Sequence, residues 1–178
     1  MELSEKAKQS LQTVGQKLQR LGEVTIHRDI PTADTPLEVW FEHLAAMRAI
    51  LGNYSNDLSL VSCLLAQSYL IRTLPMKPFD VADKPQGASG LDIDEETLDG
   101  ERVIGEVKTT VPHHGTRLGA AQITAFKKDF AKLARIDAAH KFLFVTDATS
   151  FSLMTRAYAP HLTGVTVVNL TTGETHHS

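Results

Sequence analysis

Apolar residues recur every three or four positions in several long stretches of the chain, which is the spacing of one face of an α-helix. The stretch over residues 57–74 is apolar nearly all round, as expected of a helix in the middle of a core. The clearest amphipathic stretch has lysines opposite an apolar stripe made of Ile123, Phe126, Phe130 and Leu133. The pattern predicts helices over residues 3–21, 37–51, 57–74, 118–136 and 150–158.

Strand patterns lie mainly in the second half of the chain. Residues 141–147 form a continuous apolar run, which is typical of a strand buried on both faces. Asp99 and Gly100 supply turn residues between two short alternating runs, which together predict a hairpin. The tail from residue 171 onward is expected to be frayed. The predicted strands cover residues 24–27, 79–82, 91–94, 102–109, 141–147 and 165–170.

This order of elements predicts an α/β fold with a central mixed sheet flanked by helices. A length of 178 residues fits one domain, large enough to bury a core. Within that single domain we expect an N-terminal helical extension over residues 1–54 and a core over residues 55–170.

The hairpin carries charged residues that need an explanation. Side chains on a strand alternate between faces, so Glu106 and Lys108 point to one face and Val107 to the other. Across the hairpin, Asp92 or Asp94 brings a second carboxylate to the same place. Because charged groups are rarely buried without partners, two carboxylates beside an ammonium indicate a site for a hard divalent cation such as Mg²⁺.

The hairpin resembles the active site of the PD-(D/E)XK nuclease superfamily, to which most type II restriction endonucleases belong. Asp92 matches the first position of the motif, Glu106 the second and Lys108 the third, with Val107 between the last two. Leu91 stands where the family most often has proline. Asp94 has the same parity as Asp92 and remains an alternative first acid. The resemblance implies a restriction-endonuclease-like αβββαβ core, here preceded by N-terminal helices.

The family likeness also implies a chemistry. Asp92, Glu106 and the main-chain carbonyl of Val107 would hold Mg²⁺, for which Mn²⁺ can substitute. Lys108 would position or deprotonate the attacking water, and Gln122 on the following helix would orient the water or the lysine. The expected activity is hydrolysis of phosphodiester bonds in double-stranded DNA by a homodimeric restriction-type endonuclease.

Candidate contacts to nucleic acid follow the lysine strand. The loop after Lys108 and the lysines of the next helix lie where a phosphate backbone would pass. On that helix, Lys132 and Arg135 are expected to be no more than a solvated charged face. The candidate contacts are Thr109, His113, His114, Arg117, Lys127 and Lys128.

Composition and charge limit this interpretation. The formal net charge of −3 is unusual for a nucleic-acid-binding protein, so binding would depend on local basic clusters. Cys63, in an apolar segment, is interpreted as a buried thiol in a reducing compartment. The N-terminus is polar and no apolar run is long enough to cross a bilayer, so we expect a cytoplasmic protein without membrane contact.

Other functions remain open at this point. Holliday-junction resolvases and repair nucleases share the core that the hairpin implies. A non-catalytic nucleic-acid-binding module, or a structural component of a defence complex, is the alternative of another class, and the acidic charge balance favours a protein-facing role. The sequence leaves open the recognition site, the choice between DNA and RNA, the oligomeric state and whether a partner supplies specificity.

Overall fold

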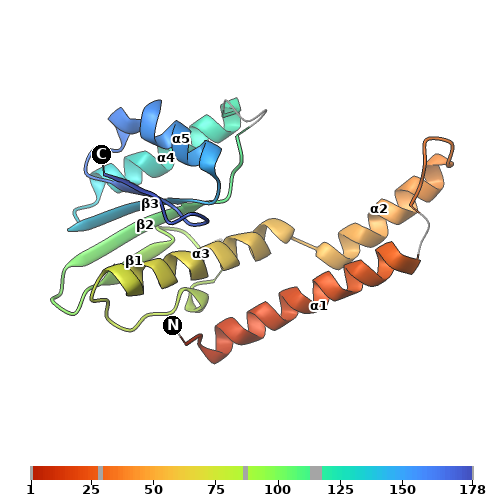
Figure 1. Cartoon of the computed structure of the whole chain (residues 1–178), viewed down its shortest axis with the longest axis horizontal. Helices are drawn as coiled ribbons and strands as arrows, with labels where there is room; N and C mark the ends of the chain where they lie inside the picture. Colours follow the sequence, from red (N-terminus) through yellow and green to blue (C-terminus); the bar gives the residue numbers. More distant parts are fainter. Residues whose placement is uncertain (1, 28–29, 86–87, 113–117, 178) are drawn as a thin grey trace. The chain divides into compact units, whose positions relative to one another are not determined.

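The computed structural model describes residues 2–27, 30–85, 88–112 and 118–177 (Figure 1). The chain divides into two compact units, Glu2–Asp57 and Leu58–Ser178. None of the helices in the described ranges is both long and apolar enough to cross a bilayer.

The first unit contains two packed helices, α1 (Glu5–His27) and α2 (Leu37–Leu51), followed by the first residues of α3 (Tyr54–Thr73). The predicted strand over residues 24–27 is wrong, because α1 continues through it. The Thr25 hydroxyl donates to the carbonyl of Leu21 at 3.1 Å, one turn back, so this β-branched residue is accommodated within the helix. Helix α2 has the predicted bounds.

The second unit is built on one five-stranded sheet with strand order β1-β2-β3-β4-β5. The two outer pairs are antiparallel and the two inner pairs, β2–β3 and β3–β4, are parallel, which confirms the predicted mixed sheet. Helices α4 (Ala120–Arg135) and α5 (Ala148–Arg156) make the crossovers between the parallel strands. The strands are β1 (Ile93–Glu96), β2 (Arg102–Lys108), β3 (His140–Val145), β4 (Thr166–Asn169) and β5 (Thr175–His177).

Helices cover both faces of this sheet, which gives the second unit three layers (Figure 1). On one face, Ile104 of β2 and Leu143 of β3 pack against Phe126 and Leu133 of α4 and against α5. On the other face, alternate strand residues pack against α3. Strand β2 therefore lies between α4 on one face of the sheet and α3 on the other.

Gly105 in the middle of β2 allows close packing on the α3 face. A Cβ at this position would lie 3.1 Å from a ring carbon of Phe144 and 3.5 Å from Ile93. The absent side chain therefore lets the Phe144 ring lie directly against the backbone of β2.

Two predictions near the ends of the sheet are wrong. Residues 79–82 do not form a strand; a short 3₁₀ helix, Val81–Asp83, lies there, and the Asp80 carboxylate accepts from the Ala82 amide at 3.0 Å at its start. An isolated bridge between Met76 and Thr97 occurs instead beside the end of β1. The tail is not frayed, because β5 pairs with β4 after a turn at Gly173, whose φ of 77° suits glycine.

Candidate active site

The alternation predicted for β2 places its charged residues toward α4. Val103 and Val107 belong to the apolar cluster with α3, whereas Ile104 packs with α4. Glu106 and Lys108, which share the parity of Ile104, both contact side chains of α4. The carboxylate and the ammonium therefore lie at the end of β2, between the sheet and that helix.

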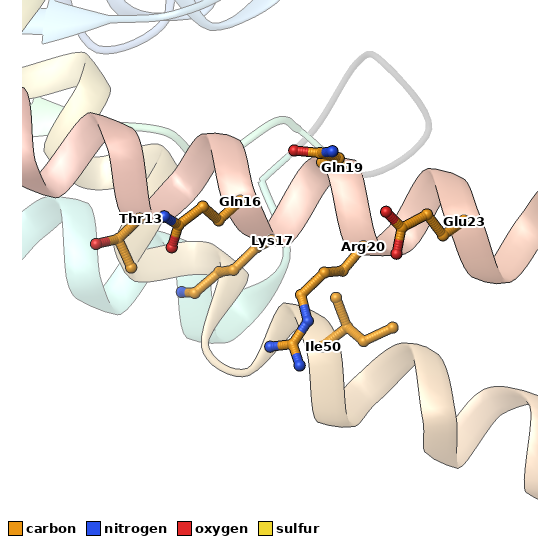
Figure 2. A pocket seen from close by; sticks show the side chains of 7 residues that line it. All are labelled: Thr13, Gln16, Lys17, Gln19, Arg20, Glu23 and Ile50. Atoms are coloured by element: carbon orange, nitrogen blue, oxygen red, sulfur yellow. The ribbon is translucent and has the colours of Figure 1, made fainter.

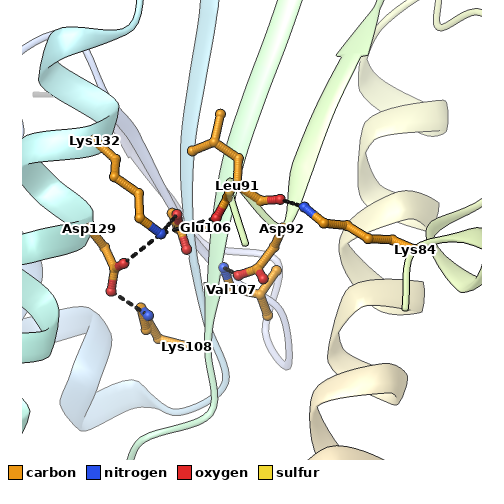
Figure 3. A network of polar contacts seen from close by, with 9 residues as sticks. Lys84, Leu91, Asp92, Glu106, Val107, Lys108, Asp129 and Lys132 are labelled. Carbon is orange, nitrogen blue, oxygen red and sulfur yellow. Dashed lines mark hydrogen bonds and ion pairs between the residues drawn. The ribbon is translucent and has the colours of Figure 1, made fainter. Parts of the chain in front are cut away.

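Four side chains form the charged cluster at this point: Glu106 and Lys108 from β2, and Asp129 and Lys132 from α4 (Figure 3). The Lys132 Nζ lies 2.8 Å from Glu106 Oε1 and 3.2 Å from Asp129 Oδ1, and it donates to the carbonyl of Gly90 at 3.1 Å. The Lys108 Nζ lies 2.5 Å from the other oxygen of Asp129. Glu106 is 2% exposed and Asp129 5% exposed, so both carboxylates depend on these partners.

Asp92 lies immediately before β1, next to the charged cluster. Its Oδ2 accepts a hydrogen bond from the backbone N–H of Val107 at 2.8 Å, which joins the two strands beside Glu106 (Figure 3). Asp94, which has the same parity in sequence, is held instead by Arg102 at 2.8 and 2.9 Å. Asp94 therefore lies opposite Ile104 and is tied to the start of β2, whereas Asp92 is bonded to Val107, between the two motif residues.

Burial and neighbouring charges set the protonation of the cluster. Burial is the largest of the causes that together raise the pKa of Glu106 to about 7; the hydrogen bond from Lys132 and the charge of Lys108 oppose the rise, and the charges of Asp92 and Asp129 add to it. Burial by itself would lower the pKa of Lys132, but the hydrogen bonds and charges of Glu106 and Asp129 outweigh it and raise that pKa. Glu106 therefore changes its protonation close to neutral pH while Lys132 stays charged.

Two further residues border Asp92. Lys84 donates to the carbonyl of Leu91, which fixes the backbone just before Asp92 (Figure 3). Cys63 of α3 is half-buried, and its pKa is raised to about 12 by burial first and then by the charge of Asp92. A thiol with so high a pKa remains protonated at neutral pH, which lowers its reactivity.

The other predicted catalytic residue lies at the start of α4. The Gln122 Oε1 accepts from the Gly119 amide at 2.8 Å, and its Nε2 donates to the carbonyl of Val111 at 3.3 Å. In this conformation the Gln122 amide links the helix start to the segment after β2. Its proposed role in orienting water stays a prediction.

The predicted nucleic-acid contacts fall into three groups. Thr109 is half-buried directly after β2, and Lys127 and Lys128 are exposed on α4. His113, His114 and Arg117 lie outside the described residues. The structure therefore gives positions to only part of this predicted surface.

Sequence reasoning missed Asp129 and misjudged Lys132. The expectation that Lys132 belongs to a solvated face is wrong, since its side chain is 25% exposed and binds two carboxylates and a carbonyl. Asp129 occupies a position within the apolar stripe of α4, next to Phe130 and three residues after Phe126. An acidic residue inside an apolar stripe is itself an indication that its side chain is buried beside a partner.

The chemistry of these oxygen donors fits Mg²⁺. Within the described ranges, no three His, Cys, Asp or Glu side chains come together as a ready ligand set. Mg²⁺ keeps several waters, however, and is commonly held by one or two carboxylates together with substrate phosphates. Three oxygens, from Gly90, Glu106 and Asp129, already surround a positive charge, that of Lys132. Asp92 and Glu106 supply two carboxylates of the kind that such a site uses.

Two surface hollows accompany these features. One, of about 520 Å³, belongs to the first unit and lies between α1 and Ile50 of α2 (Figure 2). Its charges are mixed, and its lysine, Lys17, already pairs with Asp57 at 2.7 Å, so we assign no site to it. The other, of about 470 Å³, borders the charged cluster through Lys132.

Comparisons with family models, curated proteins and solved structures give no match to this chain. The function is therefore argued from the fold and from the geometry of the charged cluster and Asp92.

Proposed function

We propose that this protein is a Mg²⁺-dependent nuclease that hydrolyses phosphodiester bonds in DNA. The observation that carries the proposal is the convergence of Asp92, Glu106 and Lys108 at the adjoining ends of β1 and β2. Glu106 is buried although burial disfavours its charged form. Ionisable groups whose charged form is destabilised by burial are concentrated at functional sites.

Part of the element order supports a restriction-endonuclease-like core. Helix α3 covers one face, the β1–β2 hairpin delivers the acids and the lysine, and α4 crosses over to the parallel strand β3. Two strands precede α4 within the described residues, whereas the expected core has three. Before β1, Met76 forms an isolated antiparallel bridge to Thr97 but no strand.

Each residue then has a defined role. Asp92, Glu106 and the Val107 carbonyl would hold Mg²⁺, or Mn²⁺ in its place. When bound, the cation lowers the pKa of a coordinated water and offsets charge on the scissile phosphate. The Lys108 ammonium, held by Asp129, would position the attacking water by donating a hydrogen bond to it, and would deprotonate that water only after losing its own proton. Gln122 would orient the same water once its amide leaves the Val111 carbonyl.

We further propose double-stranded DNA as the substrate and a homodimer as the active form. Two sites related by a two-fold axis would cut both strands of a palindromic sequence, as in restriction-type enzymes. Mapping the cut ends separates this activity from that of a junction resolvase or a repair nuclease, because only restriction-type cleavage leaves a common terminal sequence.

The charged cluster itself favours one other candidate. Lys132 and Asp129 already neutralise Glu106 and Lys108, as in a purely structural network. A non-catalytic nucleic-acid-binding module, or a structural component of a defence complex, would keep such a network without cleaving. Binding of nucleic acid without cleavage under any divalent metal would favour this candidate.

The decisive experiment is plasmid nicking with Glu106→Gln and Lys108→Met, in Mg²⁺, in Mn²⁺ and in EDTA. We expect each substitution to reduce cleavage by at least about a hundredfold, since each removes a group that binds the cation or moves a proton. Asp94→Asn is the matched control, an acid of the same hairpin away from the site, and should cleave normally. Cleavage that persists in both variants, or in EDTA, contradicts the proposal.

A further inference from the structure

The hollow of about 470 Å³ beside the charged cluster lies between two segments that are distant in sequence. One wall is the backbone turn before Asp92, where Gly90 has a φ of 107°. The other wall is the exposed face of α4. We call this feature the basic hollow; it is lined by Ala88, Ser89, Gly90, Leu91, Lys128, Lys132, Arg135 and Ile136.

The lining of the basic hollow is positively charged. Its three cations, Lys128, Lys132 and Arg135, are spaced four and three residues apart and so share one face of α4, and no acid lines the hollow among the described residues. Lys132 is committed to Glu106 and Asp129. Lys128 and Arg135 are exposed, and neither has an acidic partner within the described ranges.

This charge is local and opposes the balance of the whole chain. With a formal net charge of −3, the protein has no general attraction for polyanions. Two cations without acidic partners beside a hollow therefore mark a specific place for an anion. An arginine and a lysine on one helix face suit a phosphate, which accepts hydrogen bonds from both.

We propose that the basic hollow binds a backbone phosphate of the nucleic-acid strand, next to the phosphate that is cleaved. The proposal rests on the nuclease function and adds the path of the strand. Lys132 belongs both to the lining of the hollow and to the partners of Glu106, so a phosphate in the hollow lies directly beside the catalytic carboxylate. Lys128 and Arg135 are then positioning residues that hold the strand against the site.

The test is binding of a short labelled DNA duplex by the full chain, measured by fluorescence anisotropy in EDTA so that no cleavage occurs. Lys128→Gln and Arg135→Gln should each weaken binding roughly tenfold, and each should reduce the slope of log affinity against log salt by about one. Arg72→Gln is the control, because Arg72 is an exposed arginine of α3, which packs on the other face of the sheet, and it is not part of the lining. It should change the affinity less than about twofold.

Competition with inorganic phosphate separates the two sources of the ligand. A strand bound through several contacts should resist phosphate at concentrations that fill a single-anion site. Full displacement at such concentrations would show that the hollow takes free phosphate and would overturn the proposal. Circular dichroism of the variants, whose changed side chains are exposed, shows whether folding is unchanged.

Different experimental results would overturn this inference and the nuclease proposal. If Lys128→Gln and Arg135→Gln combined in one variant leave the affinity at the wild-type value, and Glu106→Gln loses cleavage, the proposal for the basic hollow alone is overturned. Binding that depends on Lys128 and Arg135, without cleavage in any metal, keeps the hollow and overturns the nuclease. Equal effects of Arg72→Gln and Arg135→Gln also overturn the proposal for the basic hollow, since the hollow would then add nothing to general charge.

Discussion

The two ends of β2 both carry acid–base pairs, but the pairs differ in burial. At the start of the strand, Arg102 binds Asp94 through two hydrogen bonds, and both side chains are 46% exposed. At its end, Glu106 binds Lys132 with its side chain only 3% exposed. The distance between the paired atoms is 2.8 Å in both cases. Geometry alone therefore does not separate the two pairs.

Burial gives the pairs different energetic consequences. The two side chains of an exposed ion pair stay hydrated, so the pair contributes little to the free energy of folding. A buried pair must first lose its hydration, and apolar residues of similar volume often replace such a pair without loss of stability. The charged cluster is therefore poorly explained by stability alone. We infer that it is kept for the chemistry of Glu106 and Lys108, and three changes test this difference.

The largest effect is expected from Lys132→Met, which removes the cation that neutralises Glu106. Leaving a buried carboxylate without its partner should lower the free energy of unfolding by about 3 kcal/mol at pH 8. The loss should shrink at pH 5, where Glu106 takes up a proton. Urea unfolding at the two pH values measures both. Lys128→Met is the control, an exposed lysine one turn away, and an equal effect of the two substitutions would contradict a special role for Lys132.

A smaller effect follows from pH alone. The pKa of Glu106 is raised from 4.5 to about 7 in the folded chain, so between these values the folded state binds more protons than the unfolded state. Stability from this group is therefore fully present below pH 4.5 and is lost as the pH rises to about 7. The change amounts to about 3 kcal/mol.

Comparison with Glu106→Gln isolates this contribution from that of every other titrating group. The wild type should lose stability relative to the variant across the same pH range, and parallel curves would show that the pKa of Glu106 is not raised. If Glu106 also serves the cation, wild-type cleavage should rise with pH up to about 7.

Much of the fold was predictable because the local patterns agree with the tertiary structure. Strand β3 was evident from an uninterrupted apolar run, and α4 from its stripe of apolar residues. The errors occur where tertiary contacts decide. Residues 24–27 are β-branched enough to suggest a strand but continue α1, and the tail forms β5 only because β4 offers an edge to pair with.

The candidate site was only half predictable, for a similar reason. The motif residues Glu106 and Lys108 follow from alternation along one strand. Their partners come from α4, more than twenty residues later, and spacing within either element says nothing about which residues meet. Asp129 alone left a trace, as an acid at an apolar position. Asp92 and Asp94 fall on the same face of the predicted strand, so alternation along the sequence does not distinguish them. In the structure β1 begins at Ile93, so Asp92 precedes the strand and bonds to Val107, whereas Asp94 lies within it and bonds to Arg102.

The smallest effect is expected from Asp94→Asn, at the exposed end of the strand. Arg102 lowers the pKa of Asp94 through its hydrogen bonds and charge, but both side chains remain hydrated, so we expect no measurable change in unfolding free energy. Cleavage and Mn²⁺ binding, the latter followed by electron paramagnetic resonance, should also be unchanged. Asp92→Asn, the same change two residues earlier, should abolish Mn²⁺ binding because it removes one of the two proposed carboxylate ligands. The reverse result, with Asp94 required and Asp92 dispensable, would mean that the hairpin presents its first acid from within β1. The metal would then lie nearer the exposed end of β2, away from the charged cluster.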